Sequence, residues 1–326
     1  MVDRPPERLT LGDLHPDLRR SYRFVPNIPI RHRWQRAMIR ALMRLSPGPR
    51  LTPDVAYERI DLANEVVIHL FTPLGDNTGA ALLWIHGGGM VIGSAAQDYP
   101  RSADLVRDLK ITVASVDYRL APEHPFPAPV DDCHRAWEWL LANAADRGID
   151  PGRIAIGGQS AGAGLAAGLV QRLADEGGRQ PAAQWLFCPM LDDRTAANRD
   201  LDRMRHKVWN NAANRVGWRA YLNQEPGTDG VSPYAAPARR ADLNGLPPAW
   251  IGTGTAELFY AENRIYAHAL AHAGVDCTLD SVEGAPHAFE SSSSRTPIAQ
   301  GYIHRSRAWL RAKLGLQPAV STTRRD

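Results

Sequence analysis

The residues best suited to do chemistry are centred on Ser160, within the motif Gly158-Gln159-Ser160-Ala161-Gly162. An apolar run, 153–157, precedes this G-x-S-x-G pattern and an Ala- and Leu-rich run, 161–172, follows it, which predicts a strand that turns directly into a helix. Glycine is needed on both sides of the serine because a Cβ would clash across so tight a turn. The free N–H groups of the helix start favour developing negative charge. The motif therefore predicts a nucleophile for acyl transfer, with a plain Gly/Ser-rich loop as the alternative.

A second motif, His86-Gly87-Gly88-Gly89, follows the apolar run 80–85, which predicts a central strand. Consecutive glycines expose backbone N–H groups, and two such groups aimed at a carbonyl oxygen form an oxyanion hole. We expect the N–H groups of Gly88, Gly89 and Ala161 to fill this role, while His86 and Gly87 support the loop. The alternative is a flexible turn, but the two motifs together are far more specific than either one alone.

Strand and helix patterns alternate around both motifs, which predicts a mostly parallel sheet with helices on both faces. Near the N-terminal end, two alternating segments separated by Ala63-Asn64 predict a hairpin at the edge of the sheet. A polar stretch, 195–229, interrupts the alternation. The remaining predicted elements are the hairpin strands 57–62 and 65–71, the strands 111–116, 182–190, 248–254 and 275–282, and the helix 130–144.

Composition excludes several classes of function. The 326 residues carry a net charge of +3, which gives no strong attraction to nucleic acid. The three cysteines, Cys133, Cys188 and Cys277, have no metal-binding spacing and are expected to be free thiols in a reducing compartment. The first residues lack the apolar stretch of a secretory signal, and no apolar run is long enough to span a bilayer. We therefore expect a cytoplasmic protein.

Three motifs together resemble a known family: HGGG at 86–89, DYRLAPEHPFPAP at 117–129 and G-x-S-A-G at 158–162. They are similar to the hormone-sensitive-lipase-like esterases, bacterial family IV of the α/β-hydrolases, and the resemblance extends from about Tyr57 to Leu314. It implies an α/β-hydrolase fold with a helical cap, and hydrolysis of short to medium acyl esters without metal or organic cofactor. The implied parts are an N-terminal cap segment, 1–50, a catalytic core, 51–194 and 230–316, a cap insertion, 195–229, and a disordered tail, 317–326.

The resemblance also places the partners of Ser160. His287 lies in a loop similar to the family's histidine loop, and Glu257 follows the predicted strand 248–254, where the family usually has an aspartate. The position of Glu257 is counted back from Tyr266-Ala267, which resembles a Tyr-Ala pair of the family. The order serine, acid, histidine is that of the α/β-hydrolases. The acidic alternatives are Glu262, Asp276 and Asp280. Gln159 departs from the family pattern, which usually has an aspartate there.

The segment 31–45 predicts an amphipathic helix with Trp34, Met38, Leu42 and Leu45 on one face and four arginines, Arg33, Arg36, Arg40 and Arg44, elsewhere. A basic amphipathic helix can lie on a membrane surface. We favour the alternative, in which the apolar face covers a groove of the same protein, because the resemblance implies such a groove. The residues expected to line the substrate pocket are Trp34, Met38, Gln159, Trp209 and Trp218.

These observations predict a serine carboxylesterase that acts through an acyl-enzyme on a small-molecule ester, with no cofactor, no nucleic acid and no stable membrane association. Two alternatives stay open: an amidase or acyltransferase that uses the same triad, and a ligand-binding relative without catalysis. The presence of His287 argues against the binding protein, because the loss of this residue is typical of such relatives. A homodimer is left open.

Overall fold

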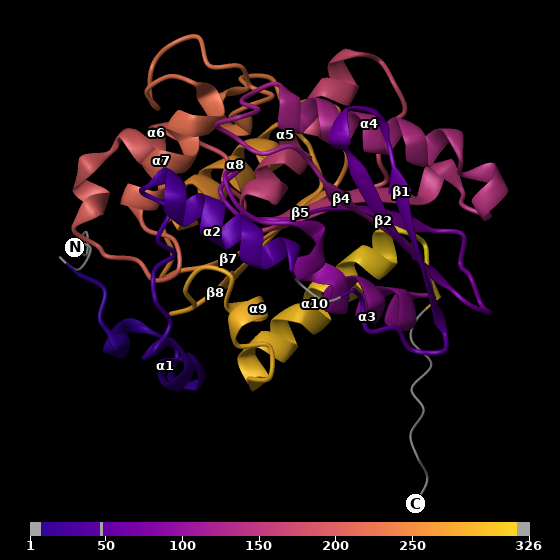
Figure 1. Ribbon diagram of the computed structural model, residues 1–326, viewed down its shortest axis with the longest axis horizontal. Helices are drawn as coiled ribbons and strands as arrows, with labels where there is room; N and C mark the ends of the chain where they lie inside the picture. The colour runs from indigo at the N-terminus through magenta and orange to yellow at the C-terminus, as the bar shows by residue number, and fades with distance from the viewer. Residues whose placement is uncertain (1–7, 46–47, 318–326) are drawn as a thin grey trace, which may run out of the picture.

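The protein is described from a computed structural model that covers residues 8–45 and 48–317. The expectation of a disordered tail concerns residues 317–326, of which all but Gln317 lie outside the described residues. Figure 1 shows a central sheet enclosed between two layers of helices. The α/β-hydrolase fold with a mostly parallel sheet is thereby confirmed.

The sheet has eight strands in the order β1-β2-β4-β3-β5-β6-β7-β8. The first hairpin pairs antiparallel and forms one edge, as its alternating pattern predicted, and all the other strands from β3 to β8 run parallel. The carboxyl ends of these parallel strands therefore meet at one edge of the sheet, where ligands bind in folds of this kind. The strands are β1 Val55–Asp61, β2 Val67–Pro73, β3 Ala81–Ile85, β4 Thr112–Asp117, β5 Ile154–Gln159, β6 Gln184–Phe187, β7 Ala249–Gly254 and β8 Cys277–Val282.

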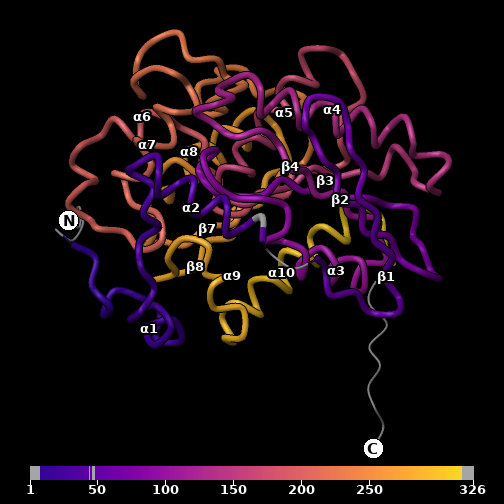
Figure 2. The backbone as a smooth tube through the Cα atoms, viewed as in Figure 1, coloured from indigo at the N-terminus to yellow at the C-terminus, as the bar shows by residue number. Residues whose placement is uncertain are grey.

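Helices cover both faces of the sheet, and Figure 2 traces their path. One apolar cluster joins the sheet to α4, α5 and α8, and a second joins it to α1, α3 and α10. The helices are α1 Pro16–Tyr22, α2 Arg33–Arg44, α3 Tyr99–Leu109, α4 Ala128–Ala142, α5 Ala161–Asp175, α6 Asp193–Ala197, α7 Asn211–Leu222, α8 Tyr260–His272, α9 Phe289–Ser292 and α10 Pro297–Lys313.

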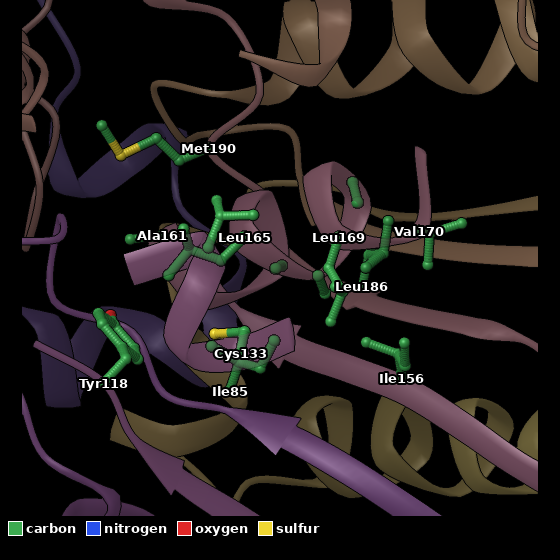
Figure 3. Close-up of a cluster of buried hydrophobic side chains, with 14 of the residues drawn as sticks. Ile85, Tyr118, Cys133, Ile156, Ala161, Leu165, Leu169, Val170, Leu186 and Met190 are labelled. Atoms are coloured by element: carbon green, nitrogen blue, oxygen red, sulfur yellow. The ribbon is translucent and has the colours of Figure 1, made fainter. Parts of the chain in front are cut away.

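The centre of the core lies beneath α5. Figure 3 shows Leu169 of this helix beside Leu186 of β6, and both belong with Leu165 and Ile156 to one buried apolar cluster. All five residues of β3 and all six of β5 are buried, because helices cover both faces of these strands. This is why the two strands read as continuous apolar runs and not as alternating patterns. A rigid core thus carries the loops that follow β3 and β5.

The helix α2 differs from the sequence expectation in its orientation. Its apolar face is turned outward, with exposed fractions of 63% for Trp34, 47% for Met38, 62% for Leu42 and 79% for Leu45. The prediction that this face covers a groove of the same protein was therefore wrong. On the opposite face Arg36 is buried and Arg40 is half-buried, and both donate to backbone carbonyl groups of the protein, which stabilises the arginine side against the core.

Candidate active site

Ser160 occupies a strained turn between β5 and α5. Its backbone angles are φ 56° and ψ −119°, a region that residues with a Cβ rarely adopt, and its N–H donates to the Phe187 carbonyl at 2.8 Å. A Cβ at Gly158 would lie 2.5 Å from the Gly162 carbonyl carbon, and one at Gly162 would lie 2.1 Å from the Ile85 oxygen. Both glycines are thus required by close approach, as the motif predicted. The turn holds the serine hydroxyl at the carboxyl edge of the sheet.

The structure brings Ser160, His287 and Glu257 together in a continuous hydrogen-bonded chain. The Nε2 atom of His287 lies 2.9 Å from Ser160 Oγ, and its Nδ1 atom is hydrogen-bonded to Glu257 Oε2. All three side chains are buried, with exposed fractions of 7% for Ser160 and 4% for the other two residues. The Nδ1 contact with a carboxylate places the proton of a neutral imidazole on Nδ1 and leaves Nε2 free to accept from the serine.

The three rival acids lie elsewhere. Glu262 accepts from the backbone N–H groups of Leu191 and Asp192, at 2.7 and 3.3 Å, and burial raises the pKa of its carboxyl well above the usual range. Asp276 pairs with Lys313, and Asp280 pairs with Arg305 at 2.8 Å. Glu257 alone among the four candidates contacts His287.

The glycine loop after β3 adopts backbone angles that favour glycine. Gly88 has φ 127° and Gly89 has φ 60°, and a Cβ at Gly89 would lie 2.1 Å from the ring of Trp209. Within residues 8–45 and 48–317, the N–H groups of Gly88, Gly89 and Ala161 donate to no protein acceptor. These donors are therefore available to an oxygen atom bound beside Ser160.

His86 supports the glycine loop through its contacts with Gly87 and Tyr118. Its ring stacks on Tyr118 at 4.3 Å between centroids, and its Nδ1 atom lies 2.8 Å from the Gly87 carbonyl. The Tyr118 hydroxyl in turn donates to the His86 carbonyl at 3.0 Å. Burial lowers the pKa of His86, so that the ring is held neutral near pH 7. Its contacts are those of a support for the loop rather than of a base.

Of the five side chains expected to line the substrate pocket, one lies against the glycine loop. The ring of Trp209, which comes from the segment before α7, packs directly on Gly89. Trp218 is fully buried in the core beside Tyr221, at 6.1 Å between ring centroids. Trp34 and Met38 lie on the exposed face of α2, so the expectation that they line the substrate pocket was wrong.

The expectation that Gln159 lines the substrate pocket was also wrong. Its amide donates to Glu290 at 2.5 Å and to Ser291 at 2.8 Å, and it borders a cavity of about 360 Å³ formed with residues of α3 and α10. Because adjacent residues of an extended strand point to opposite sides, the side chain before the nucleophile turns away from the reacting serine. Gln159 therefore holds helix α9 and does not face the substrate.

Two neighbours of the triad carry no motif. The Tyr22 hydroxyl of α1 donates to the His287 carbonyl at 3.2 Å. His206, in the segment before α7, is buried, and burial lowers its pKa to about 4. The charge of Glu257 raises the pKa of His206, whereas the charge of His287 lowers it further. The nearest signal in the sequence was its position in the polar insertion 195–229, which identifies no single residue.

Cys188 lies close to the acid and the histidine. One ligand atom each from Cys188, Glu257 and His287 lies within 4.8 Å of the others, a spacing at which three residues can hold a metal ion. A metal-binding thiol must be deprotonated, however, and burial raises the pKa of the Cys188 thiol well above its usual range. The nitrogen atoms of His287 are already engaged by Glu257 and Ser160. The residues therefore fit a hydrogen-bonded triad better than a metal site.

Comparison with known proteins gives consistent results along the chain. A family model described as the alpha/beta hydrolase fold matches residues 82–291. A carboxylic ester hydrolase, LipN, of Mycobacterium tuberculosis is 34% identical over 78% of this chain and 69% of its own length. The carboxylesterase NlhH of the same species is 32% identical over 84% of this chain and 88% of its own.

Solved structures agree with these relatives. A bacterial heroin esterase superposes with a TM-score of 0.83 at 34% identity, over 94% of this chain and 99% of that one. An esterase from the bacterial hormone-sensitive lipase family superposes with a TM-score of 0.75 at 31% identity, over 92% of this chain and 99% of that one. Among the described residues, no helix has the length and apolar character needed to cross a membrane.

Proposed function

Because this chain belongs to the α/β-hydrolase family, among the esterases that resemble hormone-sensitive lipase, it is a carboxylic ester hydrolase, and we propose that Ser160, His287 and Glu257 are its catalytic triad. The observation that carries the proposal is the hydrogen-bonded chain from Ser160 Oγ through both nitrogens of His287 to Glu257. Its substrates are small-molecule esters.

In the proposed reaction, Ser160 Oγ attacks the ester carbonyl carbon while His287 Nε2 takes the hydroxyl proton. The N–H groups of Gly88, Gly89 and Ala161 donate to the oxyanion that forms on the carbonyl oxygen. His287 then gives its proton to the leaving alcohol, which leaves an acyl group on Ser160. Water then attacks the acyl carbon while His287 Nε2 takes a proton from it. The bond to Ser160 Oγ breaks, His287 returns the proton to Ser160, and the carboxylic acid leaves.

We propose short to medium acyl chains as the preferred substrates. Two observations support this: Ser160 is nearly inaccessible, and the Trp209 ring packs on Gly89, which limits the space beside the oxyanion donors. Screening of chromogenic esters from acetyl to palmitoyl tests the length preference, and a maximum at palmitoyl would overturn it.

A cytoplasmic location is also proposed, supported by the free thiols of Cys133, Cys188 and Cys277.

The nucleophile is tested by Ser160→Ala. Turnover of a chromogenic butyrate ester should fall by at least about 10⁴-fold, because the variant has no atom that can form the acyl-enzyme. The thermal unfolding midpoint measured by circular dichroism should stay close to that of the wild type, since only one oxygen atom is removed. Substantial residual turnover in a folded variant would show that another residue is the nucleophile.

A further inference from the structure

An unusual distribution of charge marks the N-terminal part of the chain. Residues 18–53 contain no aspartate or glutamate, although the whole chain has a net charge of only +3. The remainder of the chain is therefore net negative. The segment holds nine arginines, namely Arg19, Arg20, Arg23, Arg31, Arg33, Arg36, Arg40, Arg44 and Arg50. Such a block of one sign indicates an interaction with an oppositely charged partner.

The same segment presents the exposed apolar face of α2. Trp34, Met38, Leu42 and Leu45 follow one another at spacings of four, four and three residues, so they form one stripe along the helix. The stripe is about 17 Å long at 1.5 Å per residue. Figure 1 shows α2 lying across the outside of the molecule. A contiguous exposed stripe of large apolar side chains is typical of an interaction site.

Specific contacts hold α2 in this orientation. Arg40 donates to the carbonyl groups of Val91 and Ala121, at 2.8 and 2.6 Å, and pairs with Glu123 at 2.8 Å. On the same side, Arg36 is buried and donates to the Ile30 carbonyl at 2.8 Å. The helix cannot turn its apolar stripe inward without breaking these bonds, so the exposed stripe is a stable feature of the surface.

The chemistry around the stripe indicates the kind of partner. Arg31 and Arg33 are exposed immediately before Trp34, and Phe24 is 80% exposed with the Arg23 guanidinium 5.6 Å from its ring centre. Exposed Trp, Phe and Leu side chains flanked by arginines are typical of a helix that lies in the interface of an anionic membrane. A two-fold dimer through this face would bring two strongly positive segments together, which is unfavourable.

We propose that α2 docks the enzyme reversibly on an anionic lipid surface, with Trp34, Met38, Leu42 and Leu45 inserted among the acyl chains and the neighbouring arginines at the headgroups. This differs from the stable association that the sequence argued against, since the attachment has no spanning segment. Arg40 ties α2 to Val91, two residues after Gly89, so docking would bring the side of the molecule near the glycine loop toward lipid.

The test is co-sedimentation of the full-length protein with vesicles of phosphatidylcholine alone or with 30% phosphatidylglycerol. We expect binding to the anionic vesicles only, weakened by added salt. Leu42→Glu with Leu45→Glu should weaken it at least tenfold. The matched control is Leu74→Glu with Ile265→Glu, which adds the same charge at side chains that are 58% and 64% exposed outside α2, and should bind as the wild type does.

The contribution of the arginines is tested separately. Arg31→Gln and Arg33→Gln should each weaken binding to the anionic vesicles about fivefold.

Hydrolysis of a soluble acetate ester and the thermal unfolding midpoint show that each variant is folded. The proposal is overturned if wild-type protein ignores anionic vesicles, if it binds neutral and anionic vesicles equally, or if both double variants bind alike. It is also overturned if light scattering shows a dimer that the Leu42/Leu45 variant abolishes while no vesicle is bound, because the stripe would then be an interface between two copies of this chain.

Discussion

The carboxylate of Glu257 is held by more than its contact with His287. Its second oxygen, Oε1, accepts from the Thr253 hydroxyl and from the Gly254 N–H at 3.3 Å, both at the end of β7. These donors fix the longer glutamate side chain so that its other oxygen meets the imidazole. A glutamate can therefore take the place of the aspartate that is usual in the family, because the strand end itself orients it.

We predict that Glu257→Gln loses about 10⁴-fold in turnover. The amide keeps the shape of the side chain, but its NH₂ group can donate to Nδ1 and so favour the imidazole tautomer that cannot accept from Ser160. The measurement is kcat for a chromogenic butyrate ester, with Glu262→Gln as the control. The amide oxygen of that control can still accept from Leu191 and Asp192, so its loss should be small. If Glu262→Gln were the crippled variant, the assignment of the acid would be wrong.

Among the elements, α1 controls the loop that carries His287. Leu18 and Tyr22 are fully buried, and the His15 N–H donates to the Gly284 carbonyl at 2.9 Å. Tyr22 reaches the His287 carbonyl itself. The N-terminal segment thus holds the loop of His287, which differs from the coverage by Trp34 and Met38 that the sequence suggested.

We predict that Leu18→Ala destabilises the protein by about 2–5 kcal/mol, because it leaves a cavity under α1. On warming, turnover should begin to fall at a lower temperature than in the wild type, since the His287 loop loses its support. Urea unfolding and the temperature profile of hydrolysis measure the two effects. Leu11→Ala, at a leucine of the N-terminal segment that is 37% exposed, is the control. Equal stability of the two variants would refute the role of α1.

For the molecule as a whole, we expect the burial of His206 to couple folding to pH. Its segment is pinned by backbone hydrogen bonds from Leu9 to Met204 and from Ile28 to Val208, and burial keeps its ring neutral. The pKa is about 4 in the folded protein and 6.5 in the unfolded chain. Between these values the unfolded chain binds a proton that the folded protein does not, so stability is complete above pH 6.5 and falls as the pH drops toward 4.

We predict that this single group contributes up to about 3 kcal/mol to the loss of stability between pH 6.5 and pH 4. The measurement is the free energy of urea unfolding at a series of pH values. In His206→Asn, which removes the titrating ring, the decline over this range should be shallower than in the wild type. The same substitution at exposed His304 is the matched control. An unchanged pH dependence in His206→Asn would contradict the prediction.

Features that depend on neighbours in the chain were readable from the sequence alone. The strand, turn and helix around Ser160 require glycine at Gly158 and Gly162 because of clashes within a few residues and with the adjacent strand. Continuous apolar runs that take turns with helical patterns along the chain were enough to predict the parallel sheet. The runs are continuous because the strands are buried on both faces. The partners of Ser160 came from the resemblance to a known family, and the structure places Ser160, His287 and Glu257 in contact at one edge of the sheet.

Only the tertiary structure decided which way side chains turn when the choice depends on distant partners. The periodicity of α2 defines an apolar face and an arginine face, but Arg40 finds its acceptors at Val91 and Ala121, far along the chain, and this turns the apolar face outward. In the same way, Gln159 turns toward Glu290, which no local pattern connects with it. A sequence pattern gives the faces of an element, whereas the free energy of contacts between elements determines which face is buried.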